Sequence, residues 1–212
     1  ASRTSAEILL YGMGGGEVIA EKVTMSADLK ATFDLRSPWG RSEIQLSVPG
    51  RHNVTNALAA AAVAMHAGVP ISAVSSALES LEISPLRMET FETSSGVFII
   101  NDAYNANTLS MKAALSSLVA TGRKTLIAVL GVMAELGDDH VSSHEEIGAI
   151  AKSNGVEVIS LNVEEYGGEL VSTIDEAYQI VEDKILDPQR TALLLKGSRV
   201  VALETLAQKF IN

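Results

Sequence analysis

The sequence predicts an α/β protein whose larger part is a Rossmann-like, doubly wound and mostly parallel sheet. Two observations carry this prediction. Short continuous apolar runs alternate with helical segments after residue 84, which is typical of parallel strands covered on both faces. The hydrophobic fraction is 47%, yet aromatic residues make up only 4% of the chain. An aliphatic core of this kind suits helices packed closely on a sheet.

Residues 1–83 are expected to form a separate, smaller unit of strands followed by helices. Its strands are predicted at 18–23, 31–35 and 43–48, with a turn at 37–40, and its helices at 52–67 and 72–81. The first of these helices is almost entirely small and apolar, which predicts burial on every side. Ile83, Ser84 and Pro85 predict a hinge, after which the pattern changes.

Residues 84–212 alternate strictly between strand and helix. Strands are predicted at 97–101, 125–130, 156–161 and 192–195, and helices at 109–120, 143–153, 174–186 and 200–210. Right-handed crossovers between parallel strands bring all their carboxyl ends to one edge of the sheet, where ligands bind in such folds.

Composition excludes several classes of partner. The formal net charge of −10 argues against nucleic acid. No segment approaches the roughly 20 continuous apolar residues of a membrane-spanning helix. The chain has no cysteine, which excludes disulfides and thiolate metal sites and fits a reducing cytoplasm. We therefore expect a cytoplasmic protein whose partners are small molecules. A monomer is expected as well, although composition does not determine the oligomeric state.

Three polar runs lie where predicted strands end, at 101–107, 131–137 and 196–199. Helix N-termini at such points offer N–H groups and partial positive charge to phosphate or carboxylate, and Lys196 and Arg199 add cations. For any one run alone, serine and asparagine that only cap helices, with a solvated Lys196, is an equally good interpretation. Three runs on one sheet edge favour a binding site.

Two other patterns are weaker. The glycine run at 12–16 resembles a dinucleotide fingerprint, but strand-like residues follow it, so a flexible hairpin loop is the better interpretation. His140 and His144 stand at helical spacing among acidic residues, as metal ligands could. A capping box, formed by Ser142 or Ser143 with Glu145 or Glu146, explains this segment better.

Two runs of residues resemble the Mur ligase family of ATP-dependent amide ligases. They are His52-Asn53-Val54-Thr55-Asn56 and Asp102-Ala103-Tyr104-Asn105-Ala106-Asn107. Further resemblance lies in the runs at 133–137, 143–148 and 195–199. The resemblance implies that 1–83 is the C-terminal part of a central ATP-binding domain and that 84–212 is the C-terminal ligase domain of a bacterial cytoplasmic enzyme.

The resemblance also implies a reaction. ATP phosphorylates the terminal carboxylate of a UDP-linked muramoyl tripeptide, and the amine of D-alanyl-D-alanine attacks the acyl phosphate to form an amide. Mg²⁺ is implied as a cofactor, with its ligands outside this chain. The chain holds no G-x-x-x-x-G-K-[ST] phosphate loop, so we expect no activity from these 212 residues alone.

Roles for individual residues follow from the same resemblance. Asn53 and Asn56 are implied to bind adenine, Asp102 the ribose, and Arg87 the ATP phosphates. Arg87 and Lys196 are implied to be catalytic, and Lys196 is expected to hold the carboxylate of the incoming dipeptide. The residues expected to face the substrates are Tyr104, Asn105, Asn107, Glu135, Lys196, Ser198 and Arg199. No metal ligand is implied.

The resemblance has departures and leaves alternatives open. The family usually has aspartate where this chain has Val132, and proline where it has Thr108. Another Mur ligase or a folylpolyglutamate synthase-like ligase would share the residues that face ATP. A nucleotide-binding module without catalysis is the alternative from a different class, and the missing phosphate loop would be natural in it.

Overall fold

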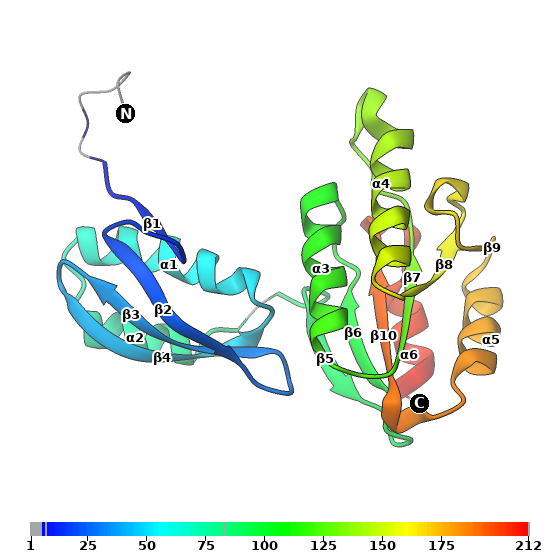
Figure 1. Ribbon diagram of the computed structural model, residues 1–212, viewed down its shortest axis with the longest axis horizontal. Coiled ribbons are helices and arrows are strands. Elements are labelled where there is room, and N and C mark those ends of the chain that lie inside the picture. Colours follow the sequence, from blue (N-terminus) through cyan, green and yellow to red (C-terminus); the bar gives the residue numbers. More distant parts are fainter. Residues whose placement is uncertain (1–5, 7, 83, 212) are drawn as a thin grey trace. The chain divides into compact units, whose positions relative to one another are not determined.

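The computed structural model describes residues 6, 8–82 and 84–211 (Figure 1). The chain divides into two compact units, residues 1–83 and 84–212. The predicted hinge includes Ile83, which lies outside the described residues. Within the part of the chain that the structure describes, no helix is long and apolar enough to cross a membrane.

Unit 1 is a four-stranded sheet packed against two helices. The strands lie in the order β1 (Tyr11–Gly12), β2 (Val18–Met25), β3 (Lys30–Ser37) and β4 (Gly40–Pro49), and they are followed by α1 (His52–His66) and α2 (Ile71–Glu79). Alternate residues of β3 and β4 form the core with one side of each helix. The prediction that the first helix is buried on every side is wrong, because Val63 is 73% exposed.

The glycine run at 12–16 connects two parallel strands rather than the arms of a hairpin. Tyr11 of β1 pairs with Val18 of β2 in parallel register, and the backbone N–H groups of Glu17 and Val18 both donate to the carbonyl of Leu10. The hairpin prediction is therefore wrong. A strand follows the glycines, as expected, so no helix N-terminus is present there to receive a dinucleotide.

Unit 2 has the doubly wound, mostly parallel sheet that the sequence predicts. The strand order is β5 (Glu89–Glu92), β6 (Phe98–Asp102), β10 (Thr191–Lys196), β7 (Thr125–Leu130), β8 (Glu157–Leu161) and β9 (Glu169–Val171). Only the edge pair β5–β6 is antiparallel. The helices are α3 (Thr108–Ala120), α4 (His140–Ser153), α5 (Ile174–Lys184) and α6 (Glu204–Ile211). Residues of α5 and α6 share a core with one face of the sheet, and α3 and α4 lie over the other face (Figure 1).

The structure differs from the prediction at four elements of unit 2. The strands β5 and β9, which are only four and three residues long, were not predicted. The helix α4 begins at His140 rather than at Ser143. The last helix begins at Glu204 rather than at Val200, because a 3₁₀ turn at Arg199–Val201 is followed by Ala202 in the left-handed conformation, with φ of 53°.

Candidate functional site

The topology of unit 2 brings the three polar runs to one sheet edge. Strand β10 lies between β6 and β7, with Lys196 in register with Asp102 on one side and with Leu130 on the other. The polar run that follows each strand therefore starts at the same edge. These three loops, at 101–107, 131–137 and 196–199, are the candidate site.

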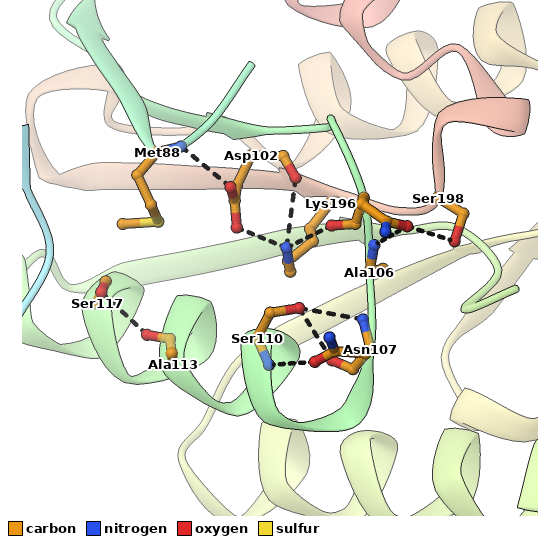
Figure 2. A network of polar contacts seen from close by, with 10 residues as sticks. Met88, Asp102, Ala106, Asn107, Ser110, Ala113, Ser117, Lys196 and Ser198 are labelled. Carbon is orange, nitrogen blue, oxygen red and sulfur yellow. Dashed lines mark hydrogen bonds and ion pairs between the residues drawn. The ribbon is translucent and has the colours of Figure 1, made fainter. Parts of the chain in front are cut away.

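A buried ion pair lies at the centre of this edge (Figure 2). Lys196 is 1% exposed, and its Nζ lies 2.6 Å from Oδ2 of Asp102 and donates to the carbonyl of Asn105 at 2.9 Å. Burial lowers the pKa of Lys196; Asp102 opposes this shift, and the nearby Arg87 adds to it. The alternative of a solvated Lys196 is wrong, since its ammonium is enclosed by groups of the chain itself. Its contact with the dipeptide carboxylate stays a prediction.

The other oxygen of Asp102 holds the first residues of unit 2. The backbone N–H of Met88 donates to Oδ1 of Asp102 at 3.0 Å, and the N–H of Tyr104 donates to the carbonyl of Leu86 at 3.0 Å. Leu86 and Met88 both have positive φ, of 64° and 51°, a conformation that costs energy in residues with a side chain. These two hydrogen bonds hold the segment that carries Arg87.

Arg87 and Arg199 gather around one aromatic ring. The guanidinium carbon of Arg87 lies 4.0 Å from the centre of the Tyr104 ring, and that of Arg199 lies 5.5 Å from it. Both arginines are exposed. Two cations on a partly buried ring form a positive surface beside Asp102, of the kind that binds phosphate or carboxylate.

Ser198 links the loops instead of capping a helix. Its hydroxyl accepts from the N–H of Ala134 at 2.9 Å. It also donates to Oδ1 of Asn105 at 3.4 Å, and Figure 2 shows this contact of Ser198 as a dashed line. The alternative that serine in this run only caps a helix does not hold for Ser198, which makes no side-chain capping hydrogen bond and is separated from α6 by the left-handed Ala202. Ser198 instead ties the run after β10 to the runs after β6 and β7.

Two further candidate residues, Asn107 and Glu135, lie in the loops after β6 and β7. Asn107 caps α3: its Oδ1 accepts from the N–H of Ser110, and its own N–H donates to the Ser110 hydroxyl. This is the capping role that the sequence left open for this run. Glu135 is exposed and has φ of 66° in the run after β7.

The candidates of unit 1 lie at the start of α1. Asn53 donates from Nδ2 to the carbonyl of Pro49 at 2.7 Å, and Asn56 donates to Oδ1 of Asn53 at 2.9 Å. Asn53 is half-buried and Asn56 is exposed. The amide of Asn56 therefore reaches solvent, while Asn53 anchors it to the end of β4.

Acidic and histidine side chains do not gather into a metal site in the part of the chain that the structure describes. No group of three or more histidine, aspartate or glutamate residues there could hold a metal ion.

Comparison with known proteins agrees with the geometry. The family model described as "Mur ligase, glutamate ligase domain" matches residues 86–202, more than half of the chain. The "Mur ligase middle domain" matches residues 1–64. The chain belongs to the Mur ligase family.

Mur ligases similar to the chain include solved and curated proteins. The UDP-N-acetylmuramoyl-tripeptide–D-alanyl-D-alanine ligase of Escherichia coli (strain K12) is 34% identical over 185 residues, which are 83% of this chain and 40% of that protein. The crystal structure of MurF from Acinetobacter baumannii has a TM-score of 0.87 at 29% identity and covers 96% of this chain and 46% of that one. MurF from Thermotoga maritima in complex with ADP, at 21% identity, shares the fold with a TM-score of 0.79 over 95% of this chain and 48% of that one. The chain thus spans less than half the length of these relatives.

The two departures from the Mur ligase pattern have structural explanations. The backbone carbonyl of Val132 accepts from the N–H of Ser198 at 2.8 Å, so this position joins two loops without a polar side chain. Thr108 is the first residue of α3, a position where proline is favoured because its missing N–H would be unpaired anyway. Threonine is compatible with the same helix start.

Close backbone approaches in this Mur ligase also explain two glycines. A Cβ on Gly131 would lie 2.9 Å from Cγ1 of Val201, and one on Gly197 would lie 3.0 Å from Cα of Gly131. A side chain at either position would push apart the loops after β7 and β10. The carbonyl of Gly131 also accepts from the Tyr166 hydroxyl at 2.8 Å.

His144 has a structural role that was not predicted from the sequence. Its ring is fully buried, with Nε2 accepting from the N–H of Met133 at 2.9 Å and Nδ1 lying 2.6 Å from the carbonyl of His140. These partners assign a neutral ring that carries its proton on Nδ1. The predicted capping box is wrong, since α4 begins three residues before Ser143 and has no side-chain cap. His144 instead holds the loop after β7.

We expect His144 to make unit 2 less stable in mild acid. Burial lowers the pKa of the His144 ring below its ordinary value of 6.5. Just below pH 6.5 this ring is therefore protonated in the unfolded chain but still neutral in the folded chain. The free energy of unfolding should be flat above pH 7 and fall as pH drops below 6.5, by at most about 1.4 kcal/mol per pH unit. Urea unfolding followed by circular dichroism between pH 5 and 8 measures this slope.

The matched control is His140, whose ring lies 4.3 Å from that of His144. His140→Gln keeps the backbone carbonyl that His144 uses and should retain the slope, whereas His144→Gln should flatten it. An equal slope in native protein and His144→Gln would show that other groups cause the pH dependence.

Proposed function

We propose that the chain is part of an ATP-dependent ligase that joins D-alanyl-D-alanine to UDP-N-acetylmuramoyl-tripeptide in peptidoglycan synthesis. The observation that carries the proposal is the edge of unit 2, where Arg87, Asp102, Tyr104 and Arg199 lie together at the carboxyl ends of parallel strands. The similar Mur ligases are named for the addition of D-alanyl-D-alanine to the tripeptide, which supports these two substrates.

Each unit offers groups suited to part of ATP. Asn56, held by Asn53, offers an exposed amide whose donor and acceptor suit the edge of adenine. Each carboxylate oxygen of Asp102 accepts one strong hydrogen bond and keeps capacity for another, so the partly exposed group can still accept from ribose hydroxyls. Arg87 would neutralise phosphate charge, and the ADP named for the Thermotoga maritima structure supports nucleotide binding by this fold.

In the proposed reaction, a carboxylate oxygen of the tripeptide attacks the γ-phosphorus of ATP and ADP leaves. The dipeptide amine then attacks the acyl carbon, loses a proton, and expels phosphate as the amide forms. The residues of this chain would position these groups and balance their charge. Mg²⁺ would neutralise phosphate charge when bound, and the proposal gives it no ligand among the described residues.

The dipeptide would lie against the loops after β7 and β10. Arg199 is the exposed cation that we propose for its carboxylate, in place of the enclosed Lys196. Asn105 and Glu135 are exposed polar groups in the neighbouring runs, and Tyr104 and Ser198 hold these runs in position. Asn107 fixes the start of α3.

A substrate screen with the complete ligase tests this proposal. ADP release in the presence of ATP, Mg²⁺ and UDP-linked tripeptide should require D-alanyl-D-alanine and should not occur with single amino acids such as D-glutamate or L-alanine. Release with a single amino acid, or with a folate and glutamate, would identify another ligase of this class. Nucleotide binding without release under any of these conditions would favour a non-catalytic module.

A further inference from the structure

We propose that Lys196 is a positioning residue that acts on nucleotide binding through Asp102 and the strained segment 86–88. The inference rests on the proposed function, because it gives Asp102 and Arg87 their part in holding ATP. It assigns Lys196 a role different from direct contact with a substrate.

The Lys196–Asp102 pair is far more buried than the other ion pairs among the described residues. The Lys196 side chain is fully enclosed, while every other ion pair found among the described residues joins side chains that are at least 23% exposed. A cation enclosed in this way is stable only where oxygen atoms surround it. Nζ has such partners in the Asp102 carboxylate and in the carbonyl of Asn105 (Figure 2).

Lys196 and the Met88 N–H together fix the orientation of the Asp102 carboxylate. Nζ binds Oδ2, which turns Oδ1 towards the N–H of Met88. Without Lys196 the carboxylate is free to rotate or to turn towards solvent, and the Met88 hydrogen bond would weaken. Lys196 thereby decides where both oxygens of Asp102 point.

The position of Arg87 depends on the same contacts. The residues on both sides of Arg87 have positive φ, so this segment is held in a costly conformation by its contacts with Asp102 and Tyr104. The Asn105 carbonyl, bound by Nζ, also fixes the loop that carries Tyr104, on which Arg87 stacks. Lys196 thus supports both sides of the Arg87–Tyr104 contact through Asp102 and the Asn105 carbonyl.

Amide hydrogen exchange in the 212-residue chain tests the positioning directly. Lys196→Met should speed exchange of the Met88 amide by about ten-fold or more, the loss expected when one hydrogen bond to a charged group is freed. Leu194→Ala is the matched control. Leu194 lies on the same strand and face and is fully buried, but it does not bond to Asp102. It should leave Met88 exchange within about two-fold of the native rate.

A double-mutant cycle in the complete ligase tests the consequence for ATP. Lys196→Met should lower kcat/KM for ATP by about five-fold or more in the native background but by less than about two-fold beside Asp102→Asn, because a residue acting through Asp102 has no route left. The KM for the dipeptide should hardly change. The pair Lys196→Met/Asp102→Asn is neutral, so it supplies a folded reference; Lys196→Gln replaces the single variant if Lys196→Met does not fold.

The outcomes separate the inference from the function on which it rests. Unchanged Met88 exchange in the folded Lys196 variant overturns the positioning role. Equal kinetic losses in both backgrounds also overturn it and leave only packing. Faster Met88 exchange without any change in ATP kinetics supports the positioning role and refutes the nucleotide role proposed for Asp102 and Arg87.

Discussion

Asp102→Ala should destabilise unit 2 by about 3–5 kcal/mol, the range found when one partner of a buried ion pair is removed. The substitution leaves the Lys196 ammonium enclosed, with backbone carbonyls as its remaining partners. It also removes the acceptor for the Met88 N–H. Urea unfolding followed by far-ultraviolet circular dichroism measures the loss in unit 2.

Two controls isolate this effect. Trp39 is the only tryptophan of the chain and lies in unit 1, so its fluorescence should show an unchanged transition. Glu146→Ala breaks the exposed pair with Lys112, whose side chains are 39% and 50% exposed, and should cost at most about 1 kcal/mol. Equal losses for Asp102→Ala and Glu146→Ala would mean that the buried pair contributes no more than a surface pair.

Arg87→Ala in the complete ligase should lower kcat/KM for ATP by about ten- to a hundred-fold. A charge-assisted hydrogen bond contributes about 1.5–3 kcal/mol, which gives a factor of this size. The KM for D-alanyl-D-alanine should change little, because Arg87 is proposed to face the nucleotide. Initial rates of ADP release at varied ATP concentration give both constants.

Two variants show whether the Arg87 effect is specific. Arg190→Ala removes the same charge from an exposed residue just before β10, at the opposite end of the strand from Lys196, and should leave ATP kinetics unchanged. Arg87→Lys keeps the charge but loses the planar group stacked on Tyr104, and should fall between native and Arg87→Ala. Native kinetics in Arg87→Ala would remove Arg87 from the nucleotide site.

Hydrophobic periodicity and the positions of glycine and proline were enough to predict the architecture of unit 2. Buried strands such as β7 and β10 are continuous apolar runs, which predict a parallel sheet covered on both faces. The edge strands β5 and β9 escaped prediction because short, partly exposed strands carry little hydrophobic signal. The late start of α6 depends on the left-handed conformation of Ala202. Alanine rarely adopts this conformation, so the residue type does not predict it.

The sequence located the candidate edge but not how its side chains are used. Lys196 was predicted to bind the dipeptide, with a solvated side chain as the alternative. Neither prediction included the ion pair that Lys196 makes with Asp102, its partner in strand register. That register depends on strand order, which spacing along the chain does not reveal. For the segment with His144, the sequence suggested only metal binding or a capping box. The hydrogen bond from the Met133 N–H could not be predicted, because it depends on the position of the loop after β7.

The most direct test of the proposed function follows one oxygen atom. Tripeptide precursor labelled with ¹⁸O in its terminal carboxylate is incubated with the complete ligase, ATP, Mg²⁺ and D-alanyl-D-alanine, and the released phosphate is analysed by mass spectrometry. Ligation through an acyl phosphate predicts one labelled oxygen in phosphate for each amide bond formed. Amide formation with unlabelled phosphate would contradict the account.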